Sequence, residues 1–150
     1  MTRAPIIASA LAAVSVLALA ACSRSGDLNH GGSVSLDGGK TVVSKRLPTD
    51  LPSYVKVYPG AVVTAVVDNK DQGGLIAYDV SDPPETVMDF YKKSASDAKF
   101  TTTTDSWSLN QDHNGAHVIM WNGAETKRSM MTTVEVKDGK THVGVMYGAS

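Results

Sequence analysis

The chain has 150 residues, with 14 Lys and Arg against 15 Asp and Glu, which gives a formal net charge of −1. This balance excludes the basic footprint of a nucleic-acid-binding domain, so we expect no nucleic-acid partner. The single cysteine excludes an internal disulfide, and the length predicts one domain stabilised by its own core.

Residues 1–21 have the pattern of an export signal. Arg3 supplies a short basic start, and residues 6–20 form an uncharged run rich in Ala, Leu and Val. This run is shorter than the roughly 20 apolar residues that a bilayer span needs, and no stop-transfer charges follow it. A cleaved signal peptide is therefore favoured over a transmembrane helix.

The run closes on Leu19-Ala20-Ala21-Cys22, which contains the only cysteine of the chain. This stretch resembles the lipobox of bacterial lipoproteins, in which a Leu and two small residues direct lipid transfer to the following Cys. The resemblance implies that Cys22 carries two or three acyl chains, enough for stable membrane anchoring. Ser23 stands where lipoproteins of the inner membrane commonly have Asp, which implies the periplasmic leaflet of the outer membrane in a Gram-negative host. An ordinary secretory signal that contains Cys is the alternative.

Residues 22–46 are rich in Gly, Ser and Asp, a composition that predicts a flexible tether. A Gly/Ser-rich chain of about 20 residues has an r.m.s. span of roughly 25 Å, so the tether would let the domain reorient near the membrane. Val34 and Leu36 alternate with Ser, which would suit a short strand, and residues 41–46 are ambiguous between strand and linker.

The domain is expected over residues 47–150. Leu47-Pro48 and Leu51-Pro52 indicate an extended entry, because the residue before a proline avoids the helical region. Residues 58–61, Tyr-Pro-Gly-Ala, predict a type II turn. The apolar segments 61–67 and 75–80, separated by a polar loop, predict an antiparallel hairpin.

One helix is predicted from Asp82, with Asp82 as its N-cap, Pro83 at its first position and Glu85 completing the cap. The apolar or small residues recur at three- and four-residue spacing and are expected to pack against a sheet. An aromatic stripe could also grip a ligand, but a packing role is favoured for Phe90 and Tyr91. The stripe comprises Val87, Phe90, Tyr91, Ser94, Ala95 and Ala98, with Asp89, Lys92, Lys93 and Asp97 facing water.

Strands are predicted after the helix at 100–109, 116–121, 130–137 and 140–147. A two-residue turn at Asp138-Gly139 places Val134 opposite Val143 on a face toward the helix. The other face pairs Glu135 with His142 and Met131 with Met146. These methionines are interpreted as ordinary solvent-facing apolar residues, with a binding surface as the alternative.

Signals for catalysis or metal binding are weak. His113 and His117 are four apart, but Asn114-Gly115 between them argues against a helix that would align them. Asp105 and Asp112 could add carboxylates to that region. Zinc sites need three or four ligands, and neither a G-x-S-x-G elbow nor a phosphate-binding glycine pattern is present. We therefore expect no metal or cofactor and no catalytic residue.

A second pattern comprises Leu51-Pro52, residues 58–61, Asp79-Val80-Ser81 and the aromatic pair Phe90-Tyr91. Over residues 51–104 it resembles small uncharacterised lipoproteins of proteobacteria, for which no activity is assigned. Such sequences often have Gly and an aromatic residue after the helix, where this chain has Lys99-Phe100. The resemblance implies a structural pattern and transfers no functional residue.

Together these observations predict an α+β domain: an antiparallel sheet of about five strands, in the order ββαβββ, with one helix packed on one face. The expected function is that of a non-enzymatic lipoprotein of the cell envelope, anchored in the membrane through Cys22, with a binding or structural role and an envelope protein as a possible partner. The alternative is a small hydrolase or metal-dependent enzyme that uses the His113–His117 region with Asp105 or Asp112.

Overall fold

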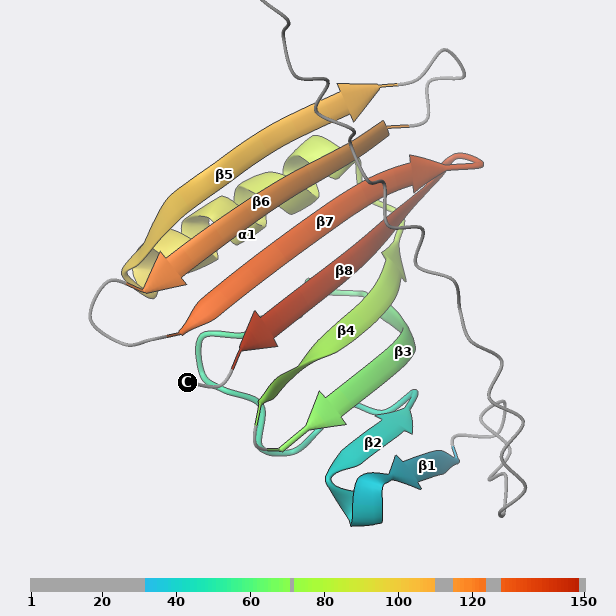
Figure 1. The fold of residues 1–150 in the computed structure, drawn as a ribbon. Helices are drawn as coiled ribbons and strands as arrows, with labels where there is room; N and C mark the ends of the chain where they lie inside the picture. The colour runs from blue at the N-terminus through green and yellow to red at the C-terminus, as the bar shows by residue number, and fades with distance from the viewer. Residues whose placement is uncertain (1–31, 71, 110–114, 124–127, 149–150) are drawn as a thin grey trace, which may run out of the picture.

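The computed structural model describes residues 32–70, 72–109, 115–123 and 128–148, which form one antiparallel sheet with a single α-helix behind it (Figure 1). The spatial order of the strands is β1-β2-β3-β4-β8-β7-β6-β5. In chain order the strands are β1 Ser33–Leu36, β2 Thr41–Ser44, β3 Val62–Asn69, β4 Gly73–Val80, β5 Phe100–Leu109, β6 Gly115–Gly123, β7 Ser129–Lys137 and β8 Lys140–Gly148, with a short 3-10 turn η2 at Asp37–Gly39 and helix α1 at Pro84–Asp97.

The expected sheet of about five strands in the order ββαβββ is wrong, because eight strands form the sheet in the order ββββαββββ. Two of the additional strands, β1 and β2, lie within residues 22–46, where the polar composition predicted a tether. They pair with each other and then with β3, so backbone hydrogen bonding to an existing edge offsets their weak apolar character. All four segments predicted as strands after the helix also pair into the sheet, rather than three.

The β7–β8 hairpin has the predicted register. Asp138 and Gly139 form its two-residue turn with φ values of 53° and 72°, which suit the right-handed twist of a hairpin. Val134 lies opposite Val143 and Met131 opposite Met146. The predicted turn at residues 58–61 is also confirmed, by a hydrogen bond from the Ala61 amide to the Tyr58 carbonyl and a φ of 77° at Gly60.

Helix α1, at Pro84–Asp97, begins one residue later than predicted. Its N-cap is Pro83 and no side chain caps it, so the expected Asp82 cap is wrong. The Asp82 carboxylate instead accepts a 2.6 Å hydrogen bond from the Tyr58 hydroxyl, and its backbone carbonyl accepts one of 2.8 Å from Thr141. These contacts fix the chain where it leaves β4, before the helix crosses the sheet to β5.

Among the described residues, segments pack on only one face of the sheet. Helix α1 packs on it beside β5 and β7, and the segment 45–61, drawn in teal in Figure 1, covers the part near β4 and β8. We call this the closed face and the opposite one the open face. A row of buried side chains crosses the closed face through five paired strands: Val66, Ile76, Val145, Thr132 and Ile119.

The covering segments are tied to the sheet by polar contacts. The Tyr54 hydroxyl donates a 2.7 Å hydrogen bond to the Gly148 carbonyl, and the Tyr91 hydroxyl donates one of 3.0 Å to the Lys56 carbonyl. The Tyr91 and Tyr78 hydroxyls are also hydrogen-bonded to each other within the core. Burial raises the pKa of Tyr78 and of Tyr91 well above the ordinary value, so both phenols stay neutral.

Candidate binding groove on the open face

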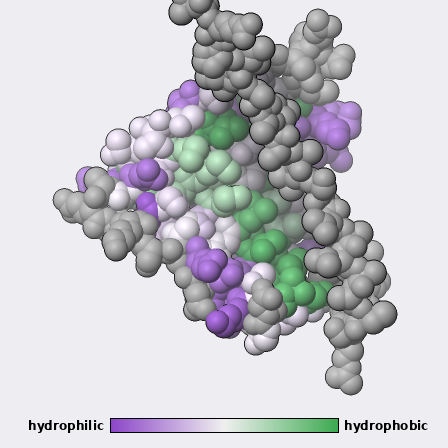
Figure 2. Space-filling view, viewed as in Figure 1, coloured by the Kyte–Doolittle hydropathy of each residue, from purple (hydrophilic) through white to green (hydrophobic). Residues whose placement is uncertain are grey.

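An unbroken row of apolar side chains crosses the open face from β1 to β6. Each member is directly opposite the next in the strand register, so the row follows from the pairing of seven strands. In Figure 2 green atoms cross the same face as a band toward β2 and β1. We call this the apolar row; it comprises Val34, Val43, Val67, Leu75, Met146, Met131 and Met120.

A groove of about 490 Å³ lies over the central part of this row. Its apolar wall consists of Val67, Leu75 and the three methionines 120, 131 and 146, while Asn69, Gln72, Asn122 and Ser129 supply its polar side chains. None of the fifteen lining residues carries a formal charge. The open-face groove, as we call it, is therefore an apolar surface with amide and hydroxyl groups along one margin.

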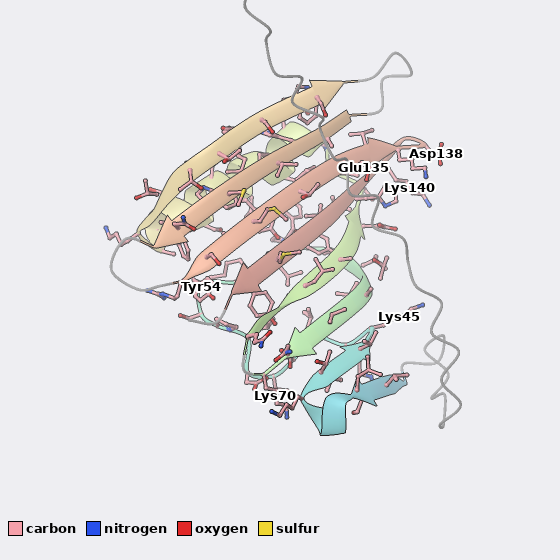
Figure 3. The ribbon with its side chains drawn as sticks, in the orientation of Figure 1. Lys45, Tyr54, Lys70, Glu135, Asp138 and Lys140 are labelled. Atoms are coloured by element: carbon pink, nitrogen blue, oxygen red, sulfur yellow. The ribbon has the colours of Figure 1, made fainter. Side chains whose placement is uncertain are left out.

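Two methionines of the groove are exposed. Met120 retains 42% and Met146 retains 48% of its exposed surface, although each lies in a strand away from the sheet edges. Figure 3 shows sulfur-containing side chains over β6, β7 and β8, whereas the labelled Lys45, Lys70 and Lys140 lie near the periphery. Flexible thioether side chains adapt to the shape of a ligand, which suits them to an irregular apolar partner.

The row of open-face residues next to the apolar row consists largely of small side chains, which project little from the sheet. The next row along the strands comprises Ala65, Ala77, Gly144, Thr133 and Val118. Within 4 Å, a Cβ atom added at Gly144 would meet only the Leu75 Cδ1 atom, at 3.9 Å, so neither backbone strain nor crowding requires glycine there. A glycine inside a strand without a structural requirement is typical of a surface that another molecule approaches closely.

Tyr147, from the closed-face side of β8, also contributes to the groove. Its hydroxyl lies 3.4 Å from an Asp68 carboxylate oxygen and donates to it. Burial and then the Asp68 charge raise the pKa of Tyr147 to about 12. The phenol therefore stays neutral at physiological pH and adds no charge to the groove.

The residues singled out in the sequence fall into two groups. Cys22, Asp112 and His113 lie outside the described residues. Asp105 and His117 are brought together across β5 and β6, with 2.5 Å between Asp105 Oδ1 and His117 Nε2. The other carboxylate oxygen of Asp105 lies 3.4 Å from the Lys92 ammonium of α1.

The Asp105–His117 pair connects the sheet with the helix that covers it. The hydrogen bond from His117 holds the pKa of Asp105 below its ordinary value of 3.8; burial opposes this effect, and the Lys92 charge adds a smaller lowering. Trp107 packs edge-on against the His117 ring at 5.2 Å. Among the described residues, no group of three His, Cys, Asp or Glu side chains is placed to hold a metal ion.

A second Asp–His pair was not anticipated from the sequence. Asp79 Oδ1 and His142 Nδ1 lie 2.7 Å apart on the open face, where β4 pairs with β8. The sequence placed Glu135 opposite His142 correctly but contained no signal that β4 lies on the other side of β8. This pair lies in a row of its own, beyond the small residues, and it is not among the residues that line the groove.

No family model matches the chain, and no curated protein matches it. Both family resemblances of the sequence therefore stay predictions. Within the described residues, no helix is long and apolar enough to cross a membrane.

Proposed function

We propose that this chain is a lipid-anchored protein of the cell envelope that binds its partner on the open face of the sheet and catalyses no reaction. The observation that carries the binding role is the open-face groove, which combines an apolar row with a polar margin and has no charged residue among its fifteen described lining residues. Exposed apolar surface of this kind is characteristic of interaction sites rather than of ordinary protein surface.

The anchoring part of the proposal rests on Leu19-Ala20-Ala21-Cys22 and its apolar context. Strand β1 begins at Ser33, eleven positions after Cys22. A fully extended chain of that length spans at most about 40 Å, so lipid on Cys22 would hold the sheet close to the membrane surface. An outer-membrane location in a Gram-negative host is proposed from Ser23.

The enzyme alternative has one favourable observation, the short contact between Asp105 and His117. Nucleophilic catalysis by such a pair needs a hydroxyl or thiol nucleophile within hydrogen-bond reach of the imidazole. Among the described residues, the partners of this pair are instead Lys92 and the ring of Trp107. These contacts suit a structural link between β5, β6 and α1, and we therefore prefer the binding role.

Metabolic labelling with a clickable fatty acid tests the anchor. We expect label on the wild-type chain, and loss of both label and membrane association in Cys22→Ser. Label retained by Cys22→Ser would refute lipidation at this residue. For the proposed location, Ser23→Asp in a Gram-negative host should move the protein to the inner membrane, while the matched control Ser25→Asp should leave it in place.

A further inference from the structure

The size and chemistry of the open-face groove indicate the class of its ligand. We infer that the groove binds the hydrocarbon chain of an uncharged amphiphile, such as a monoacylglycerol. This inference deepens the proposed binding function and rests on it. Its volume of about 490 Å³ falls among small-molecule sites, which commonly measure about 300–1,000 Å³.

The apolar row has the dimensions of an acyl chain. From Met120 on β6 to Val67 on β3 the row crosses five neighbouring strands. Strands in a sheet lie about 4.8 Å apart, so this part of the row is about 19 Å long. The acyl chains of one leaflet fill half of a hydrocarbon core about 30 Å thick, or about 15 Å, and one such chain fits along the row.

The polar margin specifies the other end of the ligand. Asn69, Ser129 and Asn122 lie in the row next to the apolar row, where Gly73 and Gly148 between them contribute no side chain. Amide and hydroxyl groups donate to and accept from hydroxyl and ester oxygens. None of the fifteen described lining residues is a cation that could compensate a phosphate or carboxylate, and burying an uncompensated charge is costly. The lining therefore favours an uncharged headgroup.

Photo-crosslinking of the full chain in phospholipid nanodiscs tests this inference. The probe is a monoacylglycerol with a diazirine in its acyl chain, and labelled peptides are mapped by mass spectrometry. We expect labelling concentrated on peptides that contain residues 73–75, 120–122, 129–131 and 146–148, and competition by unmodified monoacylglycerol. Labelling spread evenly over the chain, or unaffected by the competitor, would overturn the inference.

Two variants and one matched control locate the site. Met146→Glu and Met120→Glu place a carboxylate in the groove at positions that are about half exposed, so the fold should tolerate both. Each should lower groove labelling about tenfold, because a bound acyl chain would strip water from the new carboxylate at a cost in binding free energy. Val62→Glu is the control, because it also replaces an exposed apolar side chain with a carboxylate. Val62 is 67% exposed and lies on β3 outside the groove. Equal labelling of all four proteins would refute the site.

Three further arms separate the competing explanations. A diazirine fatty acid, which carries a carboxylate, should label the groove about tenfold less than the monoacylglycerol; equal labelling would overturn the uncharged headgroup. The oligomeric state of wild type and Met146→Glu is measured as well. If the wild type is a dimer that Met146→Glu dissociates while labelling stays unchanged, the occupant is a second copy and the inference is overturned. The Cys22→Ser chain should lose its anchor and keep groove labelling, so the two proposals can fail independently.

Discussion

The two faces of the sheet are made by the same strands and differ in what their side chains do. On the closed face the central row from Val66 to Ile119 is 1% exposed or less, and it includes no residue that a ligand could reach. One position further along the same strands, Met120 and Met146 are nearly half exposed. The apolar row on the open face therefore lies outside the buried core cluster of the described residues.

The cover of the closed face accounts for this asymmetry. A single helix and the segment 45–61 bury a row of side chains through five strands of this face, and hydrogen bonds of Tyr54 and Tyr91 hold both covering segments in place. No segment within the described ranges covers the apolar row that crosses seven strands. Such a row is unusual, because strands with one solvated face normally alternate between apolar residues toward the core and polar residues toward water. The comparison of the two faces therefore predicts that stability resides on one and binding on the other.

The largest expected effect is at Trp121, which is 2% exposed on the closed face. Trp121→Ala should lower the free energy of unfolding by about 3–5 kcal/mol, because it removes a large buried ring and leaves a cavity. Met146→Ala, the open-face counterpart, should cost less than about 1 kcal/mol, because that side chain is already half in water. Urea unfolding followed by circular dichroism measures both, and equal losses would contradict the division between the faces.

Two glycines of ordinary φ provide a finer comparison. A Cβ atom at Gly74 would lie 2.5 Å from the Val67 carbonyl oxygen and 2.6 Å from the Tyr147 hydroxyl, whereas Gly144 on the open face has space for one. Gly74→Ala should therefore cost about 1–3 kcal/mol through displaced backbone. Gly144→Ala should raise stability by about 0.5–1 kcal/mol, because glycine inside a strand is entropically unfavourable. A destabilised Gly144→Ala variant would show that glycine serves the fold there.

Local patterns in the sequence predicted the parts of the fold that depend on neighbouring residues. The β7–β8 register followed from one turn, Asp138-Gly139, and it placed Met131 opposite Met146. The predicted solvent-facing side of α1 is also confirmed, since the side chains of Asp89, Lys92, Lys93 and Asp97 are exposed. The wrong N-cap shows the limit, because Asp82 is held by Tyr58, 24 positions away in the chain.

Pairing between distant segments was not predictable in this way. The contact of β4 with β8 depends on how α1 returns the chain to the far edge of the sheet, which no turn residue specifies. Without that pairing, Leu75 cannot be placed beside Met146, and the methionine pair was interpreted as ordinary surface. The apolar row became visible only when seven strands were aligned. The sequence leaves β1 and β2 open between strand and tether, because their pairing, rather than their composition, stabilises them.

A smaller effect is expected where the cover of the closed face ends. Lys99, just after α1, has a φ of 61°, the left-handed region that side chains with a Cβ atom avoid. Lys99→Gly should therefore stabilise the chain by about 1 kcal/mol. Lys93→Gly, an exposed position inside the same helix, is the control and should lose about 1 kcal/mol. Thermal unfolding of both variants checks the expected opposite signs; two losses would mean that Lys99 makes contacts that offset its strain.

The smallest effect concerns the margin of the closed face, where Asp105 contacts His117 and Lys92. The pKa of Asp105 is below its ordinary 3.8 in the folded chain, so its ionised form stabilises the fold above about pH 4. That contribution is lost as the pH falls through the lower folded pKa. Because its side chain is 44% exposed, we expect no more than about 0.5 kcal/mol. The difference in unfolding free energy between wild type and Asp105→Asn should therefore shrink toward zero as the pH is lowered from about 6 to about 2. Asp89→Asn on the helix is the control, and a gap for Asp105→Asn that persists at the lowest pH would show that it acts through packing rather than charge.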